Sequence, residues 1–280
     1  MIVYIRKKFL QPLLAFCLLA GSLLSACTKE VTPLPGAERG NMFFYNASVA
    51  LTGQVASPTR RRVNFILMDS QDSNYVWDAD RVSKHPYFEG GKIVSFPEMV
   101  NGWATYWPVL TGPHTLRLLD SSGTVLLTDS VNLDKQNAAQ VFYTDSCGYF
   151  RSVVTTDPFM SKEKQIGMRL INLSPGNDKY FLTINKKIPA ELPAATHYGD
   201  HTGYIAMNSD RQDTLAIKVF SVSDSTNAMS RVSLIVTPGH AYTLLMSGYP
   251  ENHPASYKDP RTGRIISLQT TFVIQALKNY

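Results

Sequence analysis

The chain has 280 residues and a formal net charge of +5, from 27 basic and 22 acidic side chains. Three of the basic side chains, Arg6, Lys7 and Lys8, lie close to the N-terminus, so the remainder of the chain is almost neutral. The one basic cluster, at residues 60–62, is too short and too poor in interleaved aromatic residues for a nucleic-acid-binding surface, and we exclude nucleic acid as a partner.

Residues 1–26 are predicted to be a secretory signal peptide. Basic residues precede an apolar run that begins at Phe9 and ends in small side chains, which is the layout of an export signal. A transmembrane helix starting at Phe9 is the alternative, but the run is short and no charged residue ends it. The run closes with the sequence LSAC, which resembles the bacterial lipobox. That resemblance implies that Cys27 becomes the first mature residue and carries lipid, which anchors the chain to a membrane.

The residues that follow are predicted to form a flexible tether over 27–40, because residues 28–36 contain two prolines and a glycine among polar side chains. Of the three cysteines, Cys17 leaves with the signal and Cys27 carries the lipid, so Cys147 stands alone and no intrachain disulfide is expected. The sequence Ser-Cys-Gly is typical of a turn and no histidine is close in sequence. We therefore expect Cys147 to be a half-buried apolar residue and not a nucleophile.

From about Asn41 onward, apolar residues occur in short runs rich in Val, Ile, Phe, Tyr and Thr, separated by Gly, Pro, Asn and Asp. This pattern predicts strands and no sustained helix. A last strand is predicted from Ile266 to Ala276, where apolar and polar residues alternate. The other predicted strands span residues 62–69, 115–120, 124–129, 140–144, 180–185, 215–222, 230–236 and 241–247. The sequence thus predicts an all-β protein.

An internal repeat is visible in the order of the predicted strands. Residues 41–48 align with 167–174, and both segments end in an Asn-x-Ser turn. Residues 114–118 align with 213–217, and the hairpin over 131–143 aligns with the one over 234–246. Each copy has the size of one β-sandwich, so we predict a first domain over 41–157, a linker over 158–165 and a second domain over 166–280.

The second copy resembles the bacterial domain-of-unknown-function family 4397 over residues 166–249. The matching segments are MRLINLSPG from Met168, FLTIN from Phe181, the pair Tyr198 and Gly199, and TPGHAYTL from Thr237. The resemblance implies an exported, often lipid-anchored protein with tandem Ig-like (transthyretin/fibronectin-like) antiparallel β-sandwich domains and no catalytic residues. In the first copy only the opening strand and the closing hairpin match.

The first copy contains an insertion of 27 positions, because 70 positions separate Asn46 from Leu116 whereas 43 separate Asn172 from Leu215. Aromatic side chains on loops are a common way to bind a sugar face or a protein. The alternative is that two of the tryptophans fill the core of the sandwich. We expect Trp107 to be the more exposed ring and Trp103 to point inward. The candidate ligand-binding residues in the insertion are Trp77, Trp103, Tyr106 and Trp107.

Two further segments have metal-ligand side chains, but neither has the pattern of a metal site. His197, Asp200 and His201 are suitable zinc ligands, yet the turn at Gly199 and the lack of a further ligand argue against a site. The acidic run from Asp69 to Asp80 lacks the glycine and glutamate of a calcium-binding loop. We expect no metal, no cofactor and no catalytic residue.

The functional prediction is a non-catalytic, lipid-anchored protein of the cell envelope that binds or scaffolds a protein partner. The alternative is a surface glycan-binding lipoprotein that uses the aromatic insertion. Because Thr28 and not aspartate follows Cys27, the sequence is compatible with the outer membrane, on its periplasmic face or at the cell surface.

Overall fold

The computed structural model divides into two units, residues 1–37 and 38–280, and only the second unit is described here. The described residues are 38–55, 63–69, 87–89, 95–120, 124–156, 162–259 and 263–279. The predicted signal peptide, Cys27, Trp77 and the first half of the predicted linker lie outside them. Among the described residues, no helix is long and apolar enough to cross a membrane.

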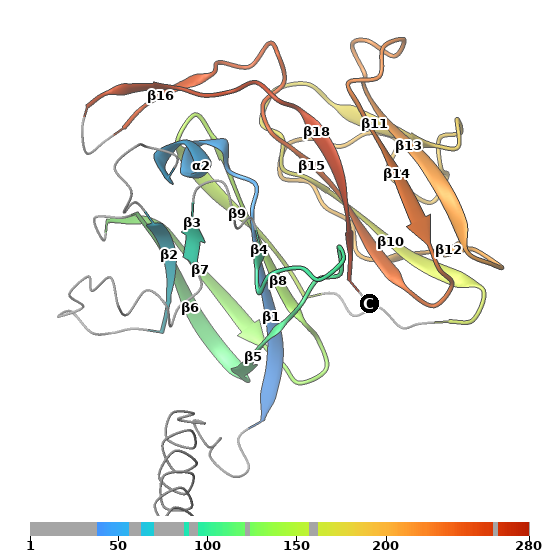
Figure 1. Ribbon diagram of the computed structural model, residues 1–280, viewed down its shortest axis with the longest axis horizontal. Coiled ribbons are helices and arrows are strands. Elements are labelled where there is room, and N and C mark those ends of the chain that lie inside the picture. Colours follow the sequence, from blue (N-terminus) through green and yellow to red (C-terminus); the bar gives the residue numbers. More distant parts are fainter. Residues whose placement is uncertain are drawn as a thin grey trace, which may run out of the picture. The chain divides into compact units, whose positions relative to one another are not determined.

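The first repeat is a pair of facing sheets, drawn in blue to green in Figure 1. Sheet A contains β1 (Arg39–Asn46), β4 (Ser95–Phe96), β5 (Trp107–Leu110), β8 (Ala139–Ser146) and β9 (Tyr149–Thr155). Sheet B contains β2 (Val63–Met68), β3 (Tyr87–Glu89), β6 (Gly112–Leu119) and β7 (Val125–Leu133). A short helix, α2 (Val49–Val55), follows β1.

The second repeat, drawn in yellow to red, has the same plan. Sheet C contains β10 (Gln165–Asn172), β12 (Ile205–Asn208), β15 (Ala241–Ser247) and β18 (Val273–Lys278). Sheet D contains β11 (Tyr180–Ile184), β13 (Asp213–Ser221) and β14 (Ser230–Val236). A small hairpin of β16 (Ser256–Lys258) and β17 (Ile265–Ser267) is inserted before β18.

The described strands confirm the all-β prediction, and their pairing is similar in the two halves. In sheet A, β1 lies between β5 and β8, and in sheet C the equivalent strand β10 lies between β12 and β15. Asn46 is opposite Tyr143, and Asn172 is opposite Met246, so the Asn-x-Ser turns occupy the same place in both copies. The central strands β1 and β10 therefore have equivalent neighbours, although sheets A and B each contain one described strand more than sheets C and D.

The prediction that the sheets are purely antiparallel is wrong in one respect. Within the described chain, the β1–β8 and β10–β15 pairs are parallel. These four strands are almost completely buried along their length. Strands buried on both faces have near-continuous apolar sequences, and parallel pairing is found chiefly in such strands.

The burial on both faces arises because sheets A and C pack against each other. One core cluster fills the space between sheets A and B, and another fills the space between C and D. A third cluster joins the two repeats and contains Phe43, Tyr45, Phe142, Val153, Ile171, Leu173, Leu245 and Leu277. Residues 38–280 thus stack four sheets in the order B, A, C, D, with three apolar layers between them.

Arg169 on β10 lies in the middle of the A–C interface and is fully buried. Its guanidinium donates hydrogen bonds to Thr155 Oγ1 at 2.6 Å, Gln140 Oε1 at 2.7 Å and Thr243 Oγ1 at 2.9 Å. Its Cζ atom also lies 4.5 Å from the ring centroid of Tyr204. In the described part of the chain no carboxylate is paired with it. Neutral acceptors and ring faces from both repeats therefore replace the water around this charge.

The predicted last strand is wrong in its extent. Only β17 and β18 are strands, and residues 268–272 between them form none. Leu268 is buried in a small cluster under the β16–β17 hairpin, while Ile274 belongs to the core of the second sandwich. The alternation predicted the burial of both residues, but it could not reveal that two separate clusters bury them.

Asp129 on β7 provides a test of this packing by pH. Burial raises the pKa of its carboxyl group, and a hydrogen bond of 2.7 Å donated by Ser152 opposes the rise only in part. Because the folded state holds the proton more tightly, the stabilisation is complete below the ordinary aspartate pKa and is lost as the pH rises through the raised value. We expect Asp129→Asn to raise the melting temperature at neutral pH, with a smaller gain near pH ~4. A gain that increases on acidification would contradict this assignment.

Candidate functional site

The Asn-x-Ser turn at the end of β1 begins the candidate site. Ser48 N donates to Asn46 Oδ1 at 2.8 Å, which closes the turn, and Leu51 N donates to Ser48 Oγ at 3.1 Å, which caps α2. The equivalent turn in the second repeat is closed by Ser174 N, which donates to Asn172 Oδ1 at 3.0 Å. The sequence repeat thus predicted this local structure in both copies.

A hollow of about 510 Å³ lies beside the first turn, between the two repeats. We call it the inter-repeat groove. One wall is formed by the end of β1 and the start of α2, a second by the end of β15, and the third by the segment from β17 to β18. Its lining residues are Tyr45, Asn46, Ala47, Ser48, Val49, Thr52, Ser247, Gly248, Ile266, Ser267, Leu268, Gln269, Thr271, Val273 and Gln275. Amide and hydroxyl groups alternate with aliphatic side chains, and none of these described lining residues carries a charge.

The buried carboxylate of Asp145 holds the first wall in place. It accepts hydrogen bonds from Ser48 Oγ at 2.5 Å, from Ala50 N at 3.1 Å and from Gly148 N at 2.9 Å, and a further one from the Tyr249 hydroxyl. Burial, and then the charge of Asp145, raise the pKa of Tyr249, so this hydroxyl stays protonated and donates. The carboxylate therefore joins the turn after β1, the turn after β8 and the loop after β15.

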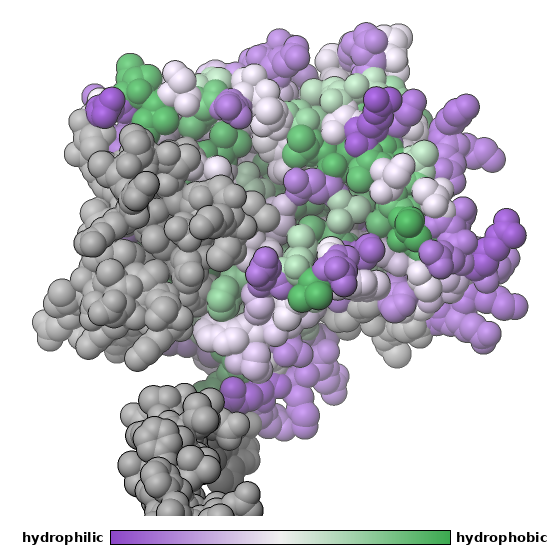
Figure 2. Space-filling model, in the orientation of Figure 1, coloured by the Kyte–Doolittle hydropathy of each residue, from purple (hydrophilic) through white to green (hydrophobic). Residues whose placement is uncertain are grey.

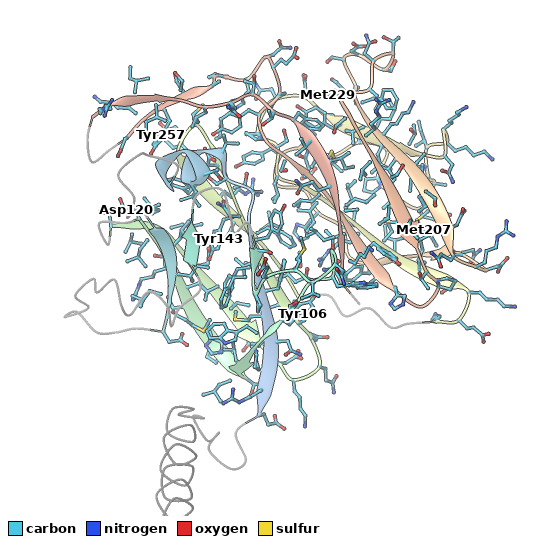
Figure 3. All side chains as sticks on the ribbon, in the orientation of Figure 1. Tyr106, Asp120, Tyr143, Met207, Met229 and Tyr257 are labelled. Atoms are coloured by element: carbon cyan, nitrogen blue, oxygen red, sulfur yellow. The ribbon has the colours of Figure 1, made fainter. Side chains whose placement is uncertain are left out.

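Glycine at two positions allows the segments in and beside the groove to pack closely. Gly248 has φ +79°, and a Cβ atom there would lie 1.8 Å from the carbonyl oxygen of Thr271. Gly148 likewise leaves room for the ring of Tyr257, which a Cβ atom would approach to 2.4 Å; Tyr257 is labelled on the hairpin in Figure 3. Only glycine fits such close contacts at positive φ.

A hydrogen bond spans the groove floor between the repeats. The Tyr45 hydroxyl of β1 donates to Gln275 Oε1 of β18. Burial raises the pKa of Tyr45 to about 12, so this hydroxyl is neutral over the physiological range. The groove thus offers a ligand neutral hydrogen-bonding groups in a partly apolar setting, which is the composition of a binding pocket.

A second hollow, of about 410 Å³, lies beside Ser146 and His253. Ser146 Oγ is 3.3 Å from His253 Nε2, and Cys147 Sγ is 3.9 Å from His253 Nδ1. Sequence reasoning missed this proximity, because 107 positions separate Ser146 from His253.

This cluster lacks the surroundings that acyl transfer needs. The backbone N–H groups of Cys147 and Gly148, which would stabilise an oxyanion beside Ser146, already donate to Tyr249 Oη and Asp145 Oδ2 at 2.9 Å. Burial also raises the pKa of the Cys147 thiol, which disfavours the nucleophilic thiolate. The geometry therefore offers no support for nucleophilic catalysis at this hollow.

The three described aromatic candidates of the insertion pack against three different groups of residues. Trp107 lies on β5, half-buried and edge-on to Phe96 with centroids 5.8 Å apart, and its being the more exposed of the two rings stays a prediction. Trp103 is also half-buried and packs against His240 of the second repeat at 4.9 Å. Tyr106, labelled in Figure 3, packs against the cluster between the repeats. Trp77 lies outside the described residues. A ligand role for the four remains a prediction.

The loop with His197 and His201 has an ordinary structural explanation. His197 N donates to the Asp200 carboxylate at 2.8 Å, which closes a turn around Gly199. Both histidine side chains are exposed. Among the described residues, no group of three or more possible metal ligands is found.

Comparison with known proteins adds little to this picture. The sequence matches no protein-family model, and no curated protein is significantly similar to it. Among solved structures, the chain shows a faint likeness to one titled "Alpha-glucan binding by a streptococcal virulence factor". The two are 11% identical, with 80% of this chain and 99% of the other covered and a TM-score of 0.24. A likeness this weak indicates neither a shared fold nor a shared ligand.

Proposed function

We propose that this chain is a lipid-anchored, non-catalytic protein of the cell envelope that binds an uncharged segment of a partner protein in the inter-repeat groove. In this proposal the two repeats are tandem Ig-like domains, as the resemblance of residues 166–249 to family 4397 implies, and Cys27 carries the lipid. The membrane is the outer membrane. The observation that carries the binding site is the uncharged groove enclosed by both repeats.

The position of the groove suits an anchored receptor. The chain enters sheet A at Arg39, where the predicted tether ends, and the groove lies at the opposite end of β1, at Asn46. A charged ligand would lose its hydration in the groove without an opposite charge to replace it. A neutral peptide can exchange its water contacts for the side-chain amides of Asn46, Gln269 and Gln275.

A neutral saccharide is the second candidate, because hydroxyl and amide groups beside aliphatic surface also suit sugar. A glycan array probed with the mature chain separates the two ligands. Ser267 is exposed and lines the groove, and its cross-strand neighbour Ser256 is exposed but outside it. Saturable sugar binding that Ser267→Trp abolishes and Ser256→Trp preserves would replace the protein partner by a glycan.

The anchor is tested by metabolic labelling with a fatty acid. We expect the native chain to incorporate the label and to fractionate with membranes, and Cys27→Ser to do neither. Cys147→Ser is the matched control and should retain the label. Incorporation of label into the Cys27→Ser variant would contradict the lipoprotein assignment.

A further inference from the structure

The outward face of sheet D is a second surface with a distinctive composition. Side chains alternate along its strands, and Leu182, Ile217, Val219 and Leu234 point into the core of the sandwich. The side chains on the opposite face come from Phe181 and Thr183 of β11, Thr214, Ala216, Lys218 and Phe220 of β13, and Arg231, Ser233 and Ile235 of β14. In Figure 2, hydrophilic groups project on the side where Figure 1 places β13.

Two phenylalanines form one row on this face, at a position where β13 pairs with β11 but not with β14. Phe181 and Phe220 are directly opposite each other on β11 and β13. Their rings are stacked, with centroids 5.3 Å apart and planes at 16°, and both side chains remain partly exposed. An aromatic pair on the solvent side of a sheet contributes contact area at low cost in side-chain entropy when it meets a partner.

The next row carries like charges. Lys218 is directly opposite Arg231, and both side chains are exposed. Like charges in directly opposite positions destabilise a sheet. Among the described residues, neither side chain forms an ion pair or hydrogen bond, and no outward position of the three strands holds an acidic residue.

Two acidic side chains near the ends of β13, Asp224 and Asp213, accept hydrogen bonds from residues close to them in the sequence. Asp224 accepts hydrogen bonds from Thr226 and Asn227, and these bonds lower the pKa of its carboxyl group. Asp213 accepts a hydrogen bond from Thr214 N at 2.7 Å. The positive charge of the outward face is therefore not balanced by the sheet that carries it.

We propose that this face docks an acidic segment of a partner protein, with its carboxylates at Lys218 and Arg231 and its apolar side chains on the Phe181–Phe220 pair. Arginine and aromatic residues beside an aliphatic one, here Ile235, are the composition enriched in protein interfaces. A bilayer is less well suited, because the two half-buried rings stack on each other and offer little apolar surface for insertion. The surface is independent of the inter-repeat groove.

The probe is fluorescently labelled poly-L-glutamate, titrated against the full mature chain at low salt. We expect saturable binding that weakens with added salt and falls by at least about tenfold in the variant Lys218→Glu/Arg231→Glu. The matched control is Lys162→Glu/Lys258→Glu, which makes the same charge change at two exposed positions elsewhere and should bind like the native chain. Phe181→Leu should weaken binding while Lys218→Arg preserves it, and thermal melts establish that each variant is folded.

Equal losses in the two charge-reversed variants would overturn the proposal, because binding would then follow net charge and not this face. Binding of heparin or anionic phospholipid vesicles without binding of poly-L-glutamate would also overturn it, in favour of a polysaccharide or a membrane. Neither result bears on the groove, which contains no charged residue.

Discussion

Replacing Arg169 by alanine is expected to lower the free energy of unfolding by about 3–5 kcal/mol, the range for deleting a large, fully buried side chain. The melting temperature should then fall by about 10 °C. The loss arises because the side chain fills the interface between sheets A and C and satisfies acceptors from both repeats. Urea denaturation followed by fluorescence measures the change.

Arg169→Met is the matched variant, because methionine restores most of the volume but none of the hydrogen bonds. We expect it to cost about 1–3 kcal/mol, the penalty for leaving buried polar groups unsatisfied. A smaller penalty for alanine than for methionine, or a loss below about 1 kcal/mol for alanine, would show that the interface does not depend on this residue.

The second large effect is expected at Asp145. Asp145→Ala removes the acceptor of four hydrogen bonds and leaves two backbone N–H groups, of Ala50 and Gly148, without it. We expect a loss of about 3–5 kcal/mol, as for removing one partner of a buried charged network. Amide hydrogen exchange should also show faster exchange at Ala50 and Gly148, since both bonds end on this carboxylate.

Asp145→Asn is the control, because it keeps the shape and one acceptor oxygen. It should lose less stability than alanine, by about 1–3 kcal/mol. If alanine and asparagine are equally stable and hydrogen exchange in the turn after β1 is unchanged, then Asp145 does not organise the wall of the groove.

Strands in which apolar and polar residues alternate could be predicted from the sequence. The way in which the sheets pack against one another could not. The alternation of Leu116 and Leu118, and of Leu215 and Ile217, marked equivalent strands in the two repeats, and all four are buried. The stacking of sheets A and C has a fainter signal, the unbroken apolar run from Met42 to Tyr45, which fits a strand buried on both faces. That run did not identify the partner sheet.

The groove was beyond prediction for a physical reason. Its walls come from segments around Ser48, Gly248 and Thr271, which are brought together only when the two repeats pack. The tryptophans were the more conspicuous candidates in the sequence. In the structure, however, Trp103 packs against His240 and Trp107 against Phe96, and neither ring lines the groove. Composition identifies side chains that are able to bind a ligand, whereas packing decides which of them remain accessible.

The measurement that tests the central claim most directly is site-specific photo-crosslinking in the cells that produce the protein. In one variant a photoreactive phenylalanine analogue replaces Ser267 in the groove. In a second variant it replaces Ser256, which is paired with Ser267 but lies outside the groove. The account predicts a discrete protein adduct from position 267 that is absent from position 256 and is lost when Asp145→Ala disrupts the wall. The same adduct from both positions, or none from position 267, would contradict the assignment of the inter-repeat groove as the binding site.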